Sequence, residues 1–272
     1  MDVKQALVAT LIISACSDNS TNFTERPDHI TPIETDFSPI TLDELGVPTQ
    51  VDQRLEYSSF EIGYRFNSKQ AAWSGYALQP ELVRVINERK DSFKIEPLLP
   101  VEHRATLNDY IGSGYQRGHL APNATLDHSE ESMVQTFYLS NISPQTGEFN
   151  TGDWLQLENF VRACVDNYAD GERVFVFTGP YFAGKLDAIG DSKLPVPTGF
   201  YKIMYEFNNT DASAIAFIAP HENFNYNNLE NFLRSIDFIE SITGLDFAEN
   251  IPDELEALLE STISPVCELP KG

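Results

Sequence analysis

The chain has 272 residues, 42% of them hydrophobic, and a formal net charge of −23 at pH 7. This length and apolar content suffice for one large domain with a substantial core, and the lack of internal repeats argues against a repeat array. The charge argues against a broad basic surface for nucleic acid, since such binding needs many Lys and Arg side chains against phosphates. A partner that carries phosphates would have to be bound by a local group of cations.

The N-terminus has the features of an export signal. A short apolar run from Ala6 to Ala15 follows Lys4; it is too short to span a membrane but suits the core of a signal sequence. The run ends in Ile-Ser-Ala-Cys at residues 13–16, which resembles a bacterial lipobox. We therefore expect residues 1–16 to be a signal sequence, Cys16 to carry lipid, and the protein to reach the periplasm or the outer envelope. A secreted protein with a leader cut elsewhere is the alternative.

The next segment, residues 17–50, is rich in Asn, Thr, Ser, Asp and Pro without a sustained apolar period. This composition predicts a flexible tether, with folding beginning near Tyr57 and one domain over residues 51–272. If Cys16 is lipidated, Cys164 and Cys267 remain as an even pair that could form a disulfide in an oxidising compartment. Two separate buried thiols are the other possibility.

Strands and helices are predicted in an order typical of an α+β fold. Helical spacing of apolar residues begins at Trp154 and continues to Tyr168, directly after N-cap candidates at residues 150–153. Strands grouped before and after this helix, without regular βαβ alternation, indicate an α+β class. The expected strands are 60–66, 71–78, 174–177, 200–207 and 214–219, with a hairpin turn at 208–211, and the other expected helices are 229–242 and 253–261.

Two dense motifs lie in the middle of the chain. Residues 115–123 read Tyr-Gln-Arg-Gly-His-Leu-Ala-Pro-Asn, and residues 140–145 read Ser-Asn-Ile-Ser-Pro-Gln, followed by Asn150 and by Trp-Leu-Gln-Leu-Glu at 154–158. A histidine can take a proton from water near neutral pH, an amide oxygen can hold a hard divalent cation, and a carboxylate can orient the waters of that cation. Together these residues point to metal-assisted phosphodiester cleavage.

These motifs resemble the signature of the DNA/RNA non-specific endonuclease family, which includes mitochondrial endonuclease G and secreted bacterial sugar-non-specific nucleases. Every residue of the signature except the first, an Asp, stands in order in this chain. Weaker similarity continues at residues 178–180, 196–202, 216–220 and 242–245, so that the resemblance spans roughly residues 58 to 250. It implies a central antiparallel sheet flanked by helices, with a ββα-metal finger in which His119 ends a strand and the metal asparagine lies by the next helix.

The resemblance also assigns roles to three residues. His119 would be the general base, Asn150 the one direct protein ligand of Mg²⁺ (Mn²⁺ being a possible substitute), and Glu158 would reach the cation through water. If Asn150 and Glu158 share one helix, they lie about 12 Å apart along its axis and about 80° apart around it, too far for both to bind directly. An N-cap is the ordinary alternative for an Asn at this place.

Four more residues belong to the candidate site. Arg117 would stabilise the developing charge on the phosphate, or else pair structurally with a carboxylate. Asn141 would support the site through hydrogen bonds, and Arg89 is a weaker candidate for an upstream phosphate arginine of the family. Gln116 stands where the family has Asp, so that an amide replaces a carboxylate beside the histidine.

The expected function is an exported, Mg²⁺-dependent endonuclease that cuts DNA and RNA with little sequence preference and leaves 5′-phosphate ends. The alternative is a non-catalytic, envelope-anchored binding protein that retains the nuclease fold, which Gln116 and the acidic charge favour. DNA and RNA are the expected substrates, with the membrane as a further partner through a lipidated Cys16. The preference among duplex DNA, single strands and RNA, any inhibitor and the oligomeric state stay open.

Overall fold

The computed structural model describes residues 41–85, 87–169, 171–207, 211–222, 224–263 and 266–270. The expected signal sequence, the candidate lipidation site at Cys16 and most of the expected tether lie outside these residues. Within the described ranges, no helix is both long enough and apolar enough to cross a membrane.

A six-stranded sheet organises the chain, in the order β1-β2-β3-β6-β9-β10 with every neighbouring pair antiparallel. The strands are β1 (Gln53–Glu56), β2 (Glu61–Arg65), β3 (Gln70–Leu78), β6 (Arg173–Tyr181), β9 (Gly199–Phe207) and β10 (Ala212–Pro220). The predicted α+β class with a central antiparallel sheet is confirmed. The inner strands are almost continuously buried, since helices cover both faces of the sheet.

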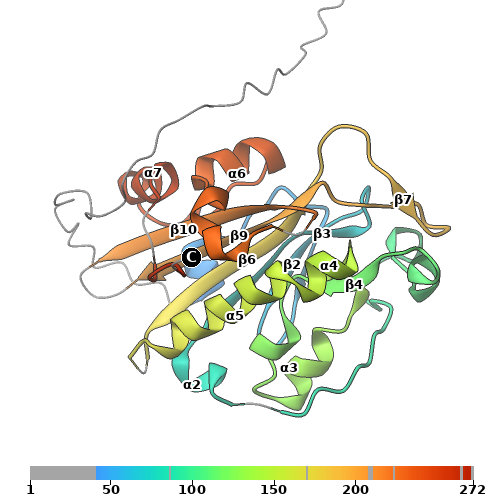
Figure 1. Ribbon diagram of the computed structural model, residues 1–272, viewed down its shortest axis with the longest axis horizontal. Coiled ribbons are helices and arrows are strands. Elements are labelled where there is room, and N and C mark those ends of the chain that lie inside the picture. The colour runs from blue at the N-terminus through green and yellow to red at the C-terminus, as the bar shows by residue number, and fades with distance from the viewer. Residues whose placement is uncertain are drawn as a thin grey trace, which may run out of the picture. The chain divides into compact units, whose positions relative to one another are not determined.

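Side chains of the sheet alternate between two hydrophobic cores. On β6, Val174 and Val176 belong to the core that contains α5 (Asp153–Asp166). The intervening Phe175 and Phe177 belong to the core that contains α1 (Leu42–Leu45), α6 (Ile236–Thr243) and α7 (Asp253–Ser261). This alternation is the period of two of a β-strand. Figure 1 shows α5 on one side of the sheet and α6 with α7 on the other.

Helix α5 has the amphipathic pattern that the sequence predicts. Trp154, Leu157, Val161 and Val165 are buried at helical spacing against the sheet. Near its end, Cys164 forms a disulfide with Cys267, with Cα atoms 5.9 Å apart across a sequence separation of 103. Of the two possibilities for these cysteines, the structure has the disulfide, which links the C-terminal segment to α5.

A separate hairpin carries the central motifs. Strand β4 (Gln116–His119) pairs with β5 (Ile142–Gln145) in antiparallel register, with His119 opposite Ile142. Helices α4 (Gly147–Thr151) and α5 follow, which completes the expected ββα arrangement. The remaining elements are α2 (Pro80–Val83), α3 (Glu130–Gln135), β7 (Ala188–Ile189), β8 (Leu194–Pro195) and 3₁₀ helices at 101–103, 107–110, 123–125, 139–141 and 226–232.

The packed structure begins earlier in the chain than the predicted boundary at residue 51. Thr41 caps α1 by accepting a hydrogen bond from the backbone of Glu44, and Leu42 and Leu45 are buried in the core beneath α6 and α7. A single helical turn is too short to show a hydrophobic period in the sequence. Such a turn is stabilised by tertiary packing and not by its own helix propensity. The end of the expected tether is therefore part of the domain.

The expected helix over residues 229–242 is two elements in the structure. A 3₁₀ helix, Tyr226–Phe232, ends before Ser235, whose side chain caps α6 by accepting from the backbone of Phe238. Ser235, which lies inside the apolar run, is therefore the N-cap of a helix, a position that serine favours. Helix α7 has the bounds that the sequence predicts.

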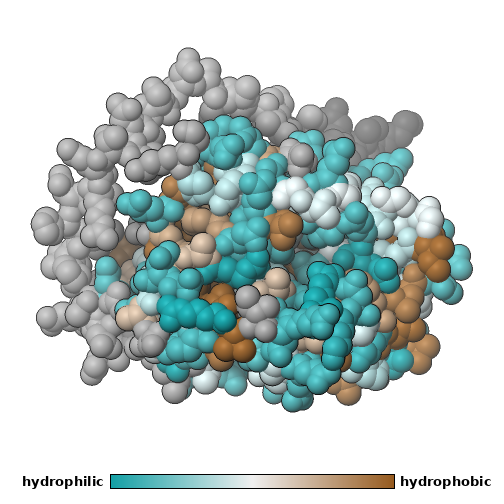
Figure 2. Space-filling model, turned by 60° about the horizontal axis from the view of Figure 1, so that its bottom comes forward, coloured by the Kyte–Doolittle hydropathy of each residue, from teal (hydrophilic) through white to brown (hydrophobic). Residues whose placement is uncertain are grey.

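The molecular surface agrees with the acidic composition. The face shown in Figure 2 is largely hydrophilic, with hydrophobic residues gathered in small patches. Of the large hydrophobic residues that the structure describes, Val101 and Ile111 are the most exposed, at 75% and 77%. A net charge of −23 favours solubility through repulsion between molecules.

Candidate functional site

The His119 side chain is held by two aromatic rings at the end of β4. The centroid of its ring lies 5.5 Å from that of Phe93 and 5.1 Å from that of Phe137, and the Phe137 contact is edge-to-face. The two phenylalanines also pack edge-to-face on each other. His119 Nε2 is enclosed and has no hydrogen-bond partner among the described residues. The orientation of the imidazole is therefore fixed by packing, with one nitrogen facing inward.

This environment keeps His119 neutral. Burial, together with the positive charges of Arg89 and Arg117, lowers its pKa to about 3, against the opposing effect of Asp91. A neutral imidazole has a free lone pair at neutral pH, which is the form that a general base needs. The predicted base thus has the right protonation state.

Two arginines stack on the same two phenylalanines. The guanidinium carbon of Arg117 lies 4.1 Å from the centroid of the Phe93 ring, and that of Arg89 lies 5.5 Å from the centroid of Phe137. Arg89 also bonds Asp91 at 2.7 Å, whereas Arg117 is exposed and makes no ion pair with a described carboxylate. The structural pairing considered for Arg117 is therefore not seen. A local group of cations surrounds His119 in an otherwise acidic protein.

Gln116 and Asn150 are joined by a hydrogen bond. Asn150 lies within α4, and its side-chain Nδ2 donates to Gln116 Oε1 at 2.7 Å. No hydrogen bond between described residues uses Asn150 Oδ1, so this oxygen is available to a cation. The N-cap of α5 is Gly152, not Asn150, which removes the ordinary capping alternative.

Helix α4 is anchored by a histidine to which the sequence assigned no role. His221 Nε2 accepts a hydrogen bond from the backbone of Thr146, the N-cap of α4, at 2.9 Å, and its Nδ1 lies 3.0 Å from the carbonyl of Pro197. These contacts require the neutral ring, and burial lowers the pKa of His221 accordingly. His221 therefore positions the helix that carries Asn150.

Glu158 lies on a different helix from Asn150. A break at Gly152, with φ −99° and ψ −121°, separates α4 from α5, so the separation calculated for one continuous helix is wrong. The Glu158 side chain faces Lys202 and Arg162, whose charges lower its pKa, but burial has the larger effect and raises it. Lys202 is fully buried on β9, and burial lowers its pKa in turn.

Lys202 and Arg162 are charged neighbours of Glu158 that the site prediction omitted. Lys202 Nζ donates to Thr178 Oγ1 at 2.7 Å and lies 4.9 Å from the Trp154 ring centroid. Arg162 is one helical turn after Glu158 and donates to Thr125 Oγ1 at 3.1 Å. The i,i+4 spacing on the predicted helix is a signal that could have found Arg162. For Lys202, the signal in the sequence was the weaker similarity to the family over residues 196–202.

Asn141 supports the site without facing it. Its side chain is fully buried, accepts from the backbone of Ala121 at 2.9 Å, and donates to the carbonyls of Ala121 and Thr136. These bonds fix the chain just after His119 and just before Phe137. Because its amide is occupied by these backbone groups, Asn141 can act only as a positioning residue.

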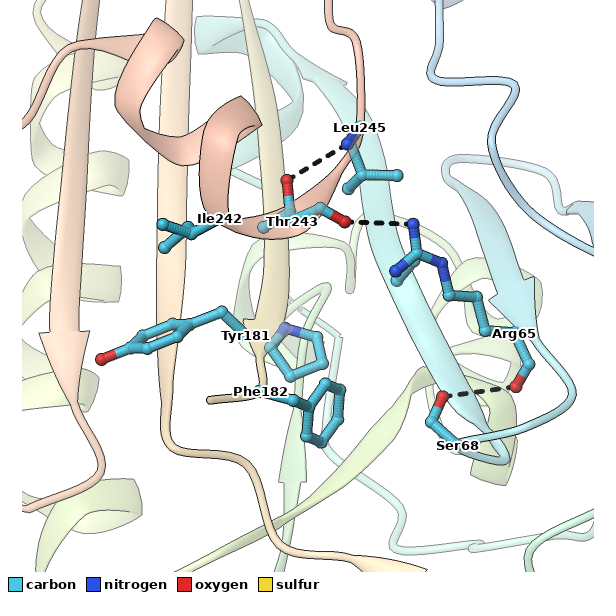
Figure 3. A pocket seen from close by; sticks show the side chains of 9 residues that line it. Arg65, Ser68, Tyr181, Phe182, Ile242, Thr243 and Leu245 are labelled. Carbon is cyan, nitrogen blue, oxygen red and sulfur yellow. Dashed lines mark hydrogen bonds between the residues drawn. The ribbon is translucent and has the colours of Figure 1, made fainter. Parts of the chain in front are cut away.

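A small pocket of about 80 Å³ lies elsewhere on the sheet (Figure 3). Arg65 lines it and donates to the backbone carbonyls of Gln50 and Thr243, which ties β2 to the end of α6. None of the candidate catalytic residues lines this pocket. It is a structural feature of the α6 layer.

Comparisons with known proteins agree with this geometry. Residues 38–254 match the family model described as DNA/RNA non-specific endonuclease. Nuclease C1 of Cunninghamella echinulata var. echinulata is 33% identical over 223 residues, covering 76% of this chain and 87% of that protein. Human mitochondrial endonuclease G is also 33% identical over 223 residues, covering 77% and 74%.

A solved structure is similar to this one over most of its length. It is the crystal structure of the EndoG/EndoGI complex, which concerns the mechanism of EndoG inhibition. The match has a TM-score of 0.72 and 27% sequence identity, and it covers 78% of this chain and 91% of the other.

Proposed function

Because the chain belongs to the DNA/RNA non-specific endonuclease family, a ββα-metal nuclease fold whose members generally use a divalent metal, we propose that it is a Mg²⁺-dependent endonuclease. It hydrolyses phosphodiester bonds of DNA and RNA with little sequence preference and leaves 5′-phosphate ends. The observation that carries this proposal is strand β4, which presents His119 at one end and holds Asn150 through Gln116 at the other.

His119 is the general base in this proposal. Its neutral ring takes a proton from the water that attacks phosphorus, and such a step contributes about 10² to 10⁴ in rate. Because Nε2 is enclosed, Nδ1 is the nitrogen that accepts the proton. The contacts with Phe93 and Phe137 keep the ring in this orientation, so that no reorganisation is needed during the reaction.

The donor set fits Mg²⁺. Asn150 Oδ1 would be the one direct ligand and Glu158 would act through water, which suits a cation that keeps most of its waters; Mn²⁺ would substitute. When bound, the cation supplies Lewis-acid stabilisation of charge on the phosphate oxygens. Gln116 fixes the Asn150 amide so that its oxygen rather than its nitrogen is free.

Arg117 binds the phosphate through an exposed guanidinium on the Phe93 ring. Phosphate contacts position a nucleic acid without reading its sequence, and the site motif contributes no side chain that reads base edges. This supports cleavage of both DNA and RNA with little preference. The weak overall attraction expected from a net charge of −23 favours product release.

A plasmid-nicking assay with and without EDTA is the first test. We expect nicking and linearisation in Mg²⁺, abolished by EDTA, and products that polynucleotide kinase labels only after phosphatase treatment. Failure to nick in Mg²⁺ or Mn²⁺, with the protein folded, would favour the non-catalytic binding protein. Products labelled without phosphatase would contradict the 5′-phosphate assignment alone.

We also propose that the protein is exported and anchored by lipid at Cys16, with secretion as the alternative. The lipobox-like residues 13–16 support this, as does the Cys164–Cys267 disulfide, since disulfides persist in oxidising compartments. Labelled palmitate should enter the full chain in a bacterial host and should not enter a Cys16→Ala variant. Equal labelling of both proteins, or of neither, would reject the anchor.

A further inference from the structure

Five carboxylates meet between α6 and α7, on the opposite side of the sheet from α5. Ligand oxygens of Asp237, Glu240 and Glu260 lie within 4.8 Å of one another, and so do those of Asp246, Glu256 and Glu260. The two groups share Glu260. Helical spacing explains the arrangement, since residues three or four apart on one helix face the same side.

Glu260 is the centre of this cluster, and its burial is not compensated. The residue is only 7% exposed, and its Oε1 has no hydrogen-bond partner among the described residues. The hydroxyl of Tyr205, a fully buried residue of β9 that faces the same carboxylates, also lacks a partner. Enclosed polar atoms without partners cost free energy, so Glu260 Oε1 and the Tyr205 hydroxyl would both be stabilised by a bound ligand.

The cluster has no cationic ion-pair partner in the part of the chain that the structure describes. Within the described ranges, no Lys or Arg forms an ion pair with any of the five carboxylates. Burial, followed by repulsion from Glu240 and Glu256, raises the pKa of Glu260 to about 9, and burial raises that of Glu240 to about 7. Without a bound cation, the cluster can be relieved only by taking up protons.

We propose that the carboxylates around Glu260 form a Ca²⁺ site, separate from the catalytic cation, that joins α6 to α7. Ca²⁺ takes oxygen ligands at about 2.3–2.6 Å, so two of its ligands lie at most about 5 Å apart, and the oxygens within each group of three meet this limit. Mg²⁺ requires a smaller, near-ideal octahedron and keeps several waters, which an irregular group of several carboxylates suits less well. The bound ion takes Glu260 Oε1 as a ligand and so links α6 to α7.

The test separates this site from the catalytic one by using the full chain with Asn150→Ala. Ca²⁺ alone is titrated by calorimetry, and the unfolding temperature is measured with and without Ca²⁺ at matched ionic strength. We expect one Ca²⁺ per chain, with a Kd on the order of 10⁻⁴ M or tighter, and a rise in unfolding temperature. Adding Glu260→Gln should weaken binding by about tenfold or more, because it removes the shared ligand charge.

Glu254→Gln is the matched control, since Glu254 is an exposed carboxylate on α7 outside both groups. It should leave Ca²⁺ binding within about twofold of its parent, as expected for a charge that does not coordinate the ion. Absence of Ca²⁺ binding to the folded Asn150→Ala protein would overturn the proposal. Equal weakening by Glu254→Gln and Glu260→Gln would also overturn it, because general screening would then explain the effect. Nuclease activity in Mg²⁺ is measured separately, because it reports on the catalytic cation and not on the Ca²⁺ site.

Discussion

The side chain of Gln116 holds Asn150 by accepting a hydrogen bond from its Nδ2 at 2.7 Å. Gln116 lies on β4 and Asn150 on α4, and the two residues are 34 positions apart in the sequence. The contact orients the amide so that Oδ1 is left for a cation. The family has an Asp where this chain has Gln116, and a carboxylate oxygen could accept the same bond. The substitution therefore preserves the geometry while removing one negative charge near the site.

This contact predicts how position 116 tolerates change. Gln116→Asp should leave the cleavage rate similar or raise it, because an acceptor for Asn150 remains. Gln116→Leu should weaken the apparent Mg²⁺ affinity by about 10- to 100-fold, as is typical when a partner of a metal ligand is lost. The measurement is cleavage rate against Mg²⁺ concentration. A large loss in Gln116→Asp would mean that the site depends on the amide itself.

The general base is tested by His119→Ala. We expect cleavage to become undetectable while folding and metal-free DNA binding are retained, because general-base catalysis supplies about 10² to 10⁴ in rate. His103→Ala is the control, since His103 stacks on Phe66 and has no contact with the site residues described above. Retention of more than about a tenth of the wild-type rate would remove His119 from the mechanism.

Arg117 should act on turnover more than on affinity. Its guanidinium meets charge that grows in the transition state, so Arg117→Ala should lower kcat far more than substrate affinity. The salt slope of binding should be shallow, reflecting roughly two to four phosphate contacts at about 0.9 each on duplex DNA. Arg84→Ala, which removes an exposed cation that pairs with Asp166, should change neither.

Two results would contradict this interpretation of Arg117. A salt slope of about six or more would require a broad basic surface. A variant that lost affinity alone would show that Arg117 binds the ground state and the transition state equally.

The buried Lys202 predicts a shift in the pH dependence of cleavage. The charge of Lys202 lowers the pKa of Glu158, so Lys202→Met should raise that pKa. If the reaction needs the Glu158 carboxylate, activity is present above this pKa and is lost as the pH falls through it. The acid limb of the pH–rate profile should therefore move to higher pH in Lys202→Met.

The control for this shift is Lys90→Met, which removes an exposed lysine that pairs with Glu130. Its profile should match that of the wild type. Unfolding temperatures of both variants separate a shift in the profile from a general loss of folded protein. An unchanged acid limb in a folded Lys202→Met protein would show that Glu158 does not set it.

The sequence by itself determined the elements and the active motifs. The β6 and β9 strands and the α5 and α7 helices follow from hydrophobic period, which is a local property of the chain. The motifs and their resemblance to the family predicted His119, Asn150 and Glu158 as site residues. These features depend on residues that are near one another in the sequence.

The tertiary structure determined which groups each of these residues contacts. The contact between Gln116 and Asn150, the anchoring of α4 by His221 and the burial of Lys202 against Thr178 join segments that are 24 to 75 residues apart. The same is true of the carboxylates around Glu260, which face one another only because α6 and α7 pack on the same side of the sheet. Hydrogen bonding and burial depend on such neighbours, and a local pattern does not contain them.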